Sequence, residues 1–130
     1  MNSRPASYTG DLFLNFDDGV EEAEYSARVT RATILEGDWV IQFSGTDREH
    51  GPYVGDMRLK SSGKVVKGEG TFRFVGDDPV AARINAKVIR KNKSTVTCEG
   101  TWFEPEEAAT YEMILDLVSL SSQKSGQAGA

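Results

Sequence analysis

The chain has 130 residues, the usual length of one domain, and 38% of them are hydrophobic and 27% charged, which is typical of a globular protein and not of a disordered or fibrous one. Its apolar runs are at most three residues long, far short of a membrane helix of about 20, and no signal-like apolar run follows the first residues. A single cysteine, Cys98, excludes an internal disulfide, and a net charge of −5 argues against nucleic-acid binding. We therefore expect a single-domain cytoplasmic protein without a membrane or nucleic-acid partner.

Apolar and polar residues alternate along almost the whole chain. Between positions 66 and 74, for example, every even position is apolar or glycine and every odd position is charged or threonine. A period of two is typical of antiparallel strands that bury one face. The alternation is least regular around Arg28 and Arg31, which have opposite parity, but Val, Thr and Ile still favour a strand there. The pattern predicts eight strands, at residues 9–16, 25–35, 38–45, 52–60, 64–75, 79–90, 94–104 and 110–119.

Short connections rich in turn-forming residues join these predicted strands, such as Ser61-Ser62-Gly63. Short links between consecutive strands make hairpins, and hairpins in series make an up-and-down meander. We therefore expect an all-β domain over residues 9–119, an eight-stranded antiparallel meander closed into a β-barrel, with two packed sheets as the alternative. Residues 1–8 are predicted to be a flexible N-terminus, and the small, polar residues 120–130 a disordered tail.

A short motif recurs about every 30 residues. Positions 36–39, 69–72 and 99–102 all have the form Glu-Gly-(Asp/Thr)-aromatic. Glycine within a strand lets a sheet bend sharply, and a nearby aromatic ring fills the space that the bend creates. We interpret the motif as a device of barrel corners, with aromatic residues that line a ligand cavity as the alternative.

The predicted plan resembles the calycin-like architecture of lipocalins and avidins. Gly100-Thr101-Trp102 is similar to the Gly-x-Trp signature of those families, which lies on their first strand and here falls on the seventh. The resemblance concerns the architecture, and it implies a closed barrel that binds a small molecule at one open end.

The predicted connections are strongly acidic at one end of the barrel. In a meander the first, third, fifth and seventh connections share an end, and here they hold twelve carboxylates against one basic residue, Arg48. Ten of the 15 basic residues lie instead between positions 58 and 93. We expect the acidic mouth to bind a small molecule or a basic protein. Self-assembly, with the basic stripe of one copy against the acidic mouth of another, is the alternative.

The expected ligand contacts come from aromatic walls and from mouth carboxylates. An eight-stranded barrel is just wide enough to be filled by side chains or to hold one small ligand, and we favour a filled or narrow interior with binding at the mouth. The predicted ligand-binding residues are Trp39, Phe43, Tyr53, Phe72, Trp102, Tyr111, Asp47 and Glu49.

Catalytic and metal chemistry have few candidate residues. His50 is the only histidine, and Asp47 or Glu49 could complete a proton shuttle with it, but no nucleophile motif surrounds it. Cys98 has the inward parity of a core residue. The acidic loops lack the ligand spacing of a calcium loop, and zinc ligands are too few. We therefore predict a non-enzymatic binding protein without metal or cofactor, with an enzyme that uses His50 as a further alternative.

Overall fold

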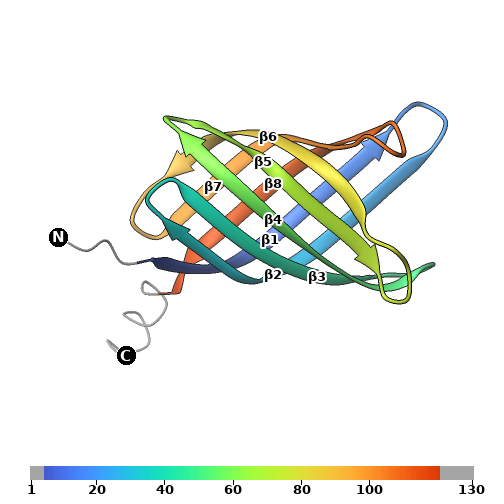
Figure 1. Cartoon of the computed structure of the whole chain (residues 1–130), viewed down its shortest axis with the longest axis horizontal. Coiled ribbons are helices and arrows are strands. Elements are labelled where there is room, and N and C mark those ends of the chain that lie inside the picture. The colour runs from blue at the N-terminus through green and yellow to red at the C-terminus, as the bar shows by residue number, and fades with distance from the viewer. Residues whose placement is uncertain (1–4, 121–130) are drawn as a thin grey trace.

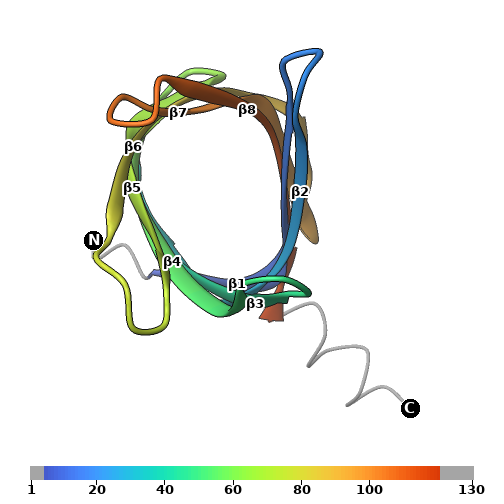
Figure 2. The ribbon, with the colours of Figure 1, turned by 90° about the vertical axis from the view of Figure 1, so that its right-hand side faces the viewer.

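The computed structural model describes residues 5–120, which form a closed barrel of eight antiparallel strands (Figure 1). The strands pair in sequence order, and β8 pairs with β1 to complete the ring (Figure 2). This confirms the predicted meander and barrel and excludes two packed sheets. The strands are β1 (Ala6–Asp17), β2 (Glu22–Leu35), β3 (Asp38–Asp47), β4 (Gly51–Ser62), β5 (Val65–Phe74), β6 (Val80–Lys91), β7 (Thr95–Glu104) and β8 (Ala109–Ser119).

The structure describes only part of the two terminal segments that the sequence predicts to be flexible. β1 begins at Ala6, three residues before the predicted start of the first strand. Residues 1–4 of the predicted flexible N-terminus, and residues 121–130 of the predicted tail, lie outside the described residues.

The irregular parity in β2 has a structural cause, a β-bulge at Thr30. Val29 pairs with Phe43 of β3 and Arg31 pairs with the next residue, Gln42, so Thr30 is an extra residue in the ladder. Val29, which precedes the bulge, and Ala32, which follows it, are therefore both buried, although one position is odd and the other even. A second bulge lies at Ile89 of β6. Bulges increase the local twist of a strand, which helps a sheet to close.

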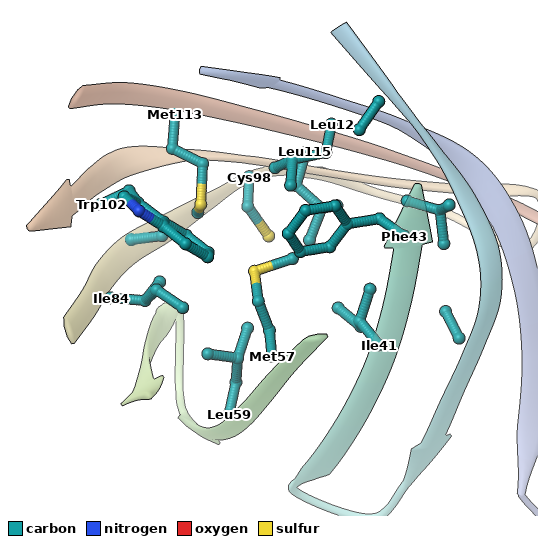
Figure 3. Close-up of a cluster of buried hydrophobic side chains, with 14 of the residues drawn as sticks. Leu12, Ile41, Phe43, Met57, Leu59, Ile84, Cys98, Trp102, Met113 and Leu115 are labelled. Carbon is teal, nitrogen blue, oxygen red and sulfur yellow. The ribbon is translucent and has the colours of Figure 1, made fainter. Parts of the chain in front are cut away.

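Inward side chains pack across the middle of the barrel. Phe43, Met57 and Trp102 come from three strands and meet near the centre, each at most 2% exposed (Figure 3). The rings of Phe43 and Trp102 are in edge contact, with their centroids 5.9 Å apart. Because each large apolar side chain buried this way stabilises the fold by about 1.5–3 kcal/mol, this packing accounts for much of the stability of the barrel.

Glycine residues allow neighbouring strands to approach closely where the barrel bends. A Cβ atom on Gly70 would lie 2.8 Å from the backbone carbonyl oxygen of Asp56 in β4, and one on Gly100 would overlap the backbone of Asn85 and Ala86 in β6. These contacts support the interpretation of the Glu-Gly-x-aromatic motif as a corner device at its second and third copies. In the first copy Gly37 lies in the turn between β2 and β3 instead.

Candidate functional site

The four odd-numbered connections gather at one end of the barrel, at the right in Figure 1 and toward the viewer in Figure 2. A cavity of about 490 Å³ opens there, within the range of small-molecule sites. We call this cavity the mouth pocket. It is lined by Leu14, Phe16, Asp18, Glu21, Glu22, Ala23, Tyr25, Phe72, Phe74, Asp77, Asp78, Val80, Glu104, Glu107, Ala108, Ala109 and Tyr111.

Aromatic rings form one side of the mouth pocket, with Tyr25 of β2 at their centre. Its ring centroid lies 5.2 Å from that of Phe72, 6.3 Å from that of Phe74 and 6.1 Å from that of Tyr111. The ring of Phe16 lies 5.3 Å from that of Tyr111 on the other side. The faces of such rings carry negative partial charge, so this surface suits apolar and cationic groups.

The charged residues that line the mouth pocket are all acidic. Among the described lining residues seven are carboxylates and none is lysine, arginine or histidine. Carboxylates clustered at the entrance of an apolar site focus a negative potential on it, which attracts cations and repels anions. The seven are Asp18, Glu21, Glu22, Asp77, Asp78, Glu104 and Glu107.

Glu104 differs from the other rim carboxylates because it is only 7% exposed. It is the last residue of β7 and has the same inward parity as Trp102, whose indole Nε1 donates a hydrogen bond to Glu104 Oε2 at 2.9 Å. Burial raises the pKa of Glu104, and the hydrogen bond from Trp102 opposes that rise in part. The pKa of Tyr111 is raised as well, by burial first and then by the field of Glu104.

The structure brings only some of the predicted ligand-binding residues together. Phe72 and Tyr111 line the mouth pocket, and the ring of Tyr53 stacks on that of Phe72 at 4.8 Å. The Tyr53 hydroxyl donates a hydrogen bond to the backbone carbonyl of Ser26 at 3.0 Å. Phe43 and Trp102 lie in the core described above, 2% and 0% exposed.

Trp39 lies toward the opposite end of the barrel. It lines a separate small cavity there with Gly63 and Lys64 of the β4–β5 connection, and it is 3% exposed. The structure therefore places Trp39 apart from the other aromatic residues of the predicted site.

Four residues that contribute to the aromatic wall or to the buried charge of the mouth pocket, Phe16, Tyr25, Phe74 and Glu104, are not among the predicted ligand contacts. Phe16 and Phe74 have inward parity at strand ends, and Glu104 follows Trp102 by two positions, so strict alternation indicates all three. Tyr25 was harder to find, because the bulge at Thr30 disturbs the parity of its strand.

Asp47, Glu49 and His50 form a tight turn in the β3–β4 connection. Asp47 Oδ2 accepts hydrogen bonds from the backbone N–H groups of Glu49 and His50, at 3.2 and 3.0 Å, and lies 2.8 Å from His50 Nδ1. The contact with the His50 side chain and these backbone bonds lower the pKa of Asp47. The carboxylate of Asp47 is thus engaged in closing its own turn, beside an exposed His50 whose ring centroid is 5.3 Å from that of Phe74.

Neither Cys98 nor a group of residues arranged to hold a metal ion lies in the described lining of the mouth pocket. Within residues 5–120 no three His, Cys, Asp or Glu side chains are arranged to hold a metal ion. Cys98 is buried in the core, where desolvation raises the pKa of its thiol to about 11. This is the state of a core residue and not of an activated nucleophile.

Comparisons with known proteins bear on the fold alone. No protein-family model and no curated protein matches the sequence. Among solved structures the chain is similar to the vaccine antigen Transferrin Binding Protein B from Haemophilus parasuis Hp5, with a TM-score of 0.58 and 7% identity, over 92% of this chain and 27% of that one. This chain therefore spans about a quarter of the length of its structural neighbour. In the described part of the chain, no helix is long and apolar enough to cross a bilayer.

Proposed function

We propose that this protein is a non-enzymatic binding protein whose mouth pocket takes a cationic ligand with an apolar body. One observation carries the proposal: the pocket combines a wall of aromatic rings with a rim on which every charged residue that the structure describes is acidic. Either feature alone is common on protein surfaces. Together they match the two halves of an organic ammonium ion, because the rings accept its apolar part and the carboxylates its charge.

In this proposal three groups of residues make different contributions to ligand binding. The exposed rim carboxylates attract the cation at long range, an effect that salt screens. The ring faces around Tyr25 hold the cation and its apolar body, with each cation–π contact worth about 0.5–2 kcal/mol. Glu104, buried beside the rings, supplies a charge-assisted hydrogen bond of about 1.5–3 kcal/mol.

A cationic side chain on a basic protein is the second form of the same ligand chemistry. The structural neighbour is named as a transferrin-binding protein, which supports a protein partner for a barrel of this kind. The depth of the aromatic wall favours a small molecule, since the ring of Phe72 is only 6% exposed. Among residues 5–120 the candidate for acid–base catalysis is the exposed turn that holds His50 and Asp47, outside the lining of the mouth pocket, so we favour binding without turnover.

The charge preference can be tested with three probes of matched shape. The intact chain is titrated with phenethylammonium, the neutral 2-phenylethanol and the anionic 3-phenylpropionate, and the backbone amide signals are followed by nuclear magnetic resonance. We expect saturable shifts for the ammonium probe alone, confined to the mouth ends of the strands and weaker at high salt. Equal or tighter binding of the anionic probe would overturn the proposal.

Two variants locate the site. Glu104→Gln removes the buried charge and should weaken the ammonium probe about tenfold, and Phe74→Ala should weaken it about threefold or more. Glu99→Gln is the matched control, since it removes an exposed charge from the outer face of the same strand, β7. Equal weakening by Glu99→Gln and Glu104→Gln would mean that only the total charge matters, in contradiction to a specific site.

A further inference from the structure

The outer surface of the barrel carries a hollow of about 880 Å³ across β4, β5 and β6. Its base is low because the outward residues there, Thr71 of β5 and its cross-strand partner Ala81 of β6, have short side chains. Four basic side chains line it, Arg58, Lys60, Lys67 and Arg83, against two acidic ones, Asp56 and Glu69. We call this hollow the basic groove.

Strand register concentrates positive charge in the basic groove. Glu69 lies directly between Arg58 and Arg83, its partners on the two neighbouring strands. Lys60 and Lys67, in contrast, are opposite each other across β4 and β5. Like charges directly opposite in a sheet repel each other, so an anionic group placed above this pair would stabilise the sheet.

The outer face of β1 and β8 has the complementary character. Phe13 and Ile114 are direct cross-strand partners, and they remain 40% and 39% exposed. Asp11 and Asp116 are paired just beyond them, and Glu112 and Glu99 lie beside them on β8 and β7. A basic side chain, Arg28, approaches this face at 3.8 Å from Asp11. We call this surface of two apolar side chains among four carboxylates the acidic wall.

The acidic wall and the basic groove lie on opposite sides of the molecule. In the closed ring of eight strands, the β8–β1 pair is four places away from the β4–β5 pair (Figure 2). We propose that the acidic wall of one copy docks into the basic groove of a second copy. Phe13 and Ile114 then enter the hollow above Thr71 and Ala81, and Asp116 and Glu112 face Lys67 and Lys60.

The chain itself carries the occupant that the groove requires, an apolar projection flanked by carboxylates. Because the two surfaces differ and face in opposite directions, the contact is heterologous, and it adds copies in a row instead of closing a two-fold dimer. This contact involves neither the mouth pocket nor its ligand, so its test is independent of the proposed function.

Charge-reversal variants of the full chain test this arrangement by sedimentation velocity. A groove variant carries Lys60→Glu and Lys67→Glu, and a wall variant carries Glu112→Lys and Asp116→Lys, with circular dichroism as the check that both fold. The native chain should associate further as its concentration rises at about 0.01 M salt, where charges act over about 30 Å, and should dissociate at about 1 M salt.

The decisive measurement mixes the two variants. Each variant alone should stay monomeric, because each has lost one of the two surfaces. An equimolar mixture should associate again, since the native wall of the groove variant fits the native groove of the wall variant, and the two altered surfaces also carry opposite charges. A native chain that stays monomeric at millimolar concentration and low salt would overturn the proposal, as would association of either variant alone to the native extent.

Discussion

The indole Nε1 of Trp102 donates a hydrogen bond to Oε2 of Glu104 at 2.9 Å, and this bond joins the core of the barrel to the mouth pocket. Trp102 is fully buried at the centre of the barrel, and Glu104 lines the pocket two residues further along β7. A carboxylate in this position costs folding free energy when it is charged, because burial removes most of its water. Such a cost is typical of residues that serve a site and not the fold.

Replacement of that carboxylate should stabilise the protein at neutral pH. Burial raises the pKa of Glu104 in the folded state, so the unfolded chain loses this proton first and the native protein loses stability as the pH rises through the folded pKa. Glu104→Gln avoids this loss, and the amide oxygen of Gln can still accept the Trp102 hydrogen bond. Urea unfolding followed by circular dichroism should show a more stable variant at pH 7 and a smaller difference near pH 4.

Glu99→Gln is the control for this experiment, because Glu99 is exposed on the outer face of β7 and its replacement should change stability little at either pH. A Glu104→Gln protein less stable than the native one at pH 7 would show that the charge of Glu104 is compensated in the fold.

Replacement of Trp102, the donor of this hydrogen bond, should instead lower the free energy of unfolding. Trp102→Phe removes the donor, leaves the buried Glu104 acceptor without it and opens space in the core, so we expect a loss of about 2–4 kcal/mol in the free energy of unfolding. In the Glu104→Gln background the loss should be smaller, since a neutral acceptor depends less on the missing donor. Additive effects in this double-mutant cycle would contradict an energetic coupling between the two residues.

Most of the fold follows from local alternation, and its exceptions follow from backbone geometry. The parity of residues 66–74 correctly indicates which side chains of β5 enter the barrel, because a buried face repeats with the period of the strand. The parity of β2 does not, because Thr30 adds one residue to the ladder. A bulge depends on pairing with the neighbouring strand, which the local sequence does not encode.

The candidate site was harder to predict than the fold. Alternation shows that Trp39 and Phe72 are both inward, but not that one lies toward the far end and the other at the mouth. Position along the barrel axis depends on the stagger between strands, which is a property of the closed ring. The sequence indicates Glu104 only as one of several loop carboxylates. Its side chain is buried because β7 continues for two residues after Trp102, which gives Glu104 the same inward parity as Trp102.

Gly100 provides a test of close strand approach in the barrel. A Cβ atom at this position would overlap backbone atoms of β6, which cannot move without disturbing the ladder, so Gly100→Ala should destabilise the fold by about 3 kcal/mol or more. Gly63 is the matched control, since it needs a left-handed backbone, with φ of 62°, but has open space around it. Gly63→Asn should cost well under half as much, because Asn tolerates that conformation. Equal losses at the two sites would show that backbone freedom, and not close approach, is what Gly100 provides.

Cys98 should report on the integrity of the barrel without any mutation. Its thiol is 1% exposed on β7, and burial raises its pKa to about 11, so at pH 8 the folded protein presents almost no accessible thiolate. Reaction with Ellman's reagent should therefore be slower by a factor of about 1,000 or more in the native protein than in urea, given an unfolding free energy of about 5 kcal/mol or more. The rate in increasing urea should follow the unfolding curve measured by circular dichroism. A fast reaction in native buffer, with no change in circular dichroism, would mean that the centre of the barrel opens locally and that the packing of Phe43, Met57 and Trp102 does not hold it closed.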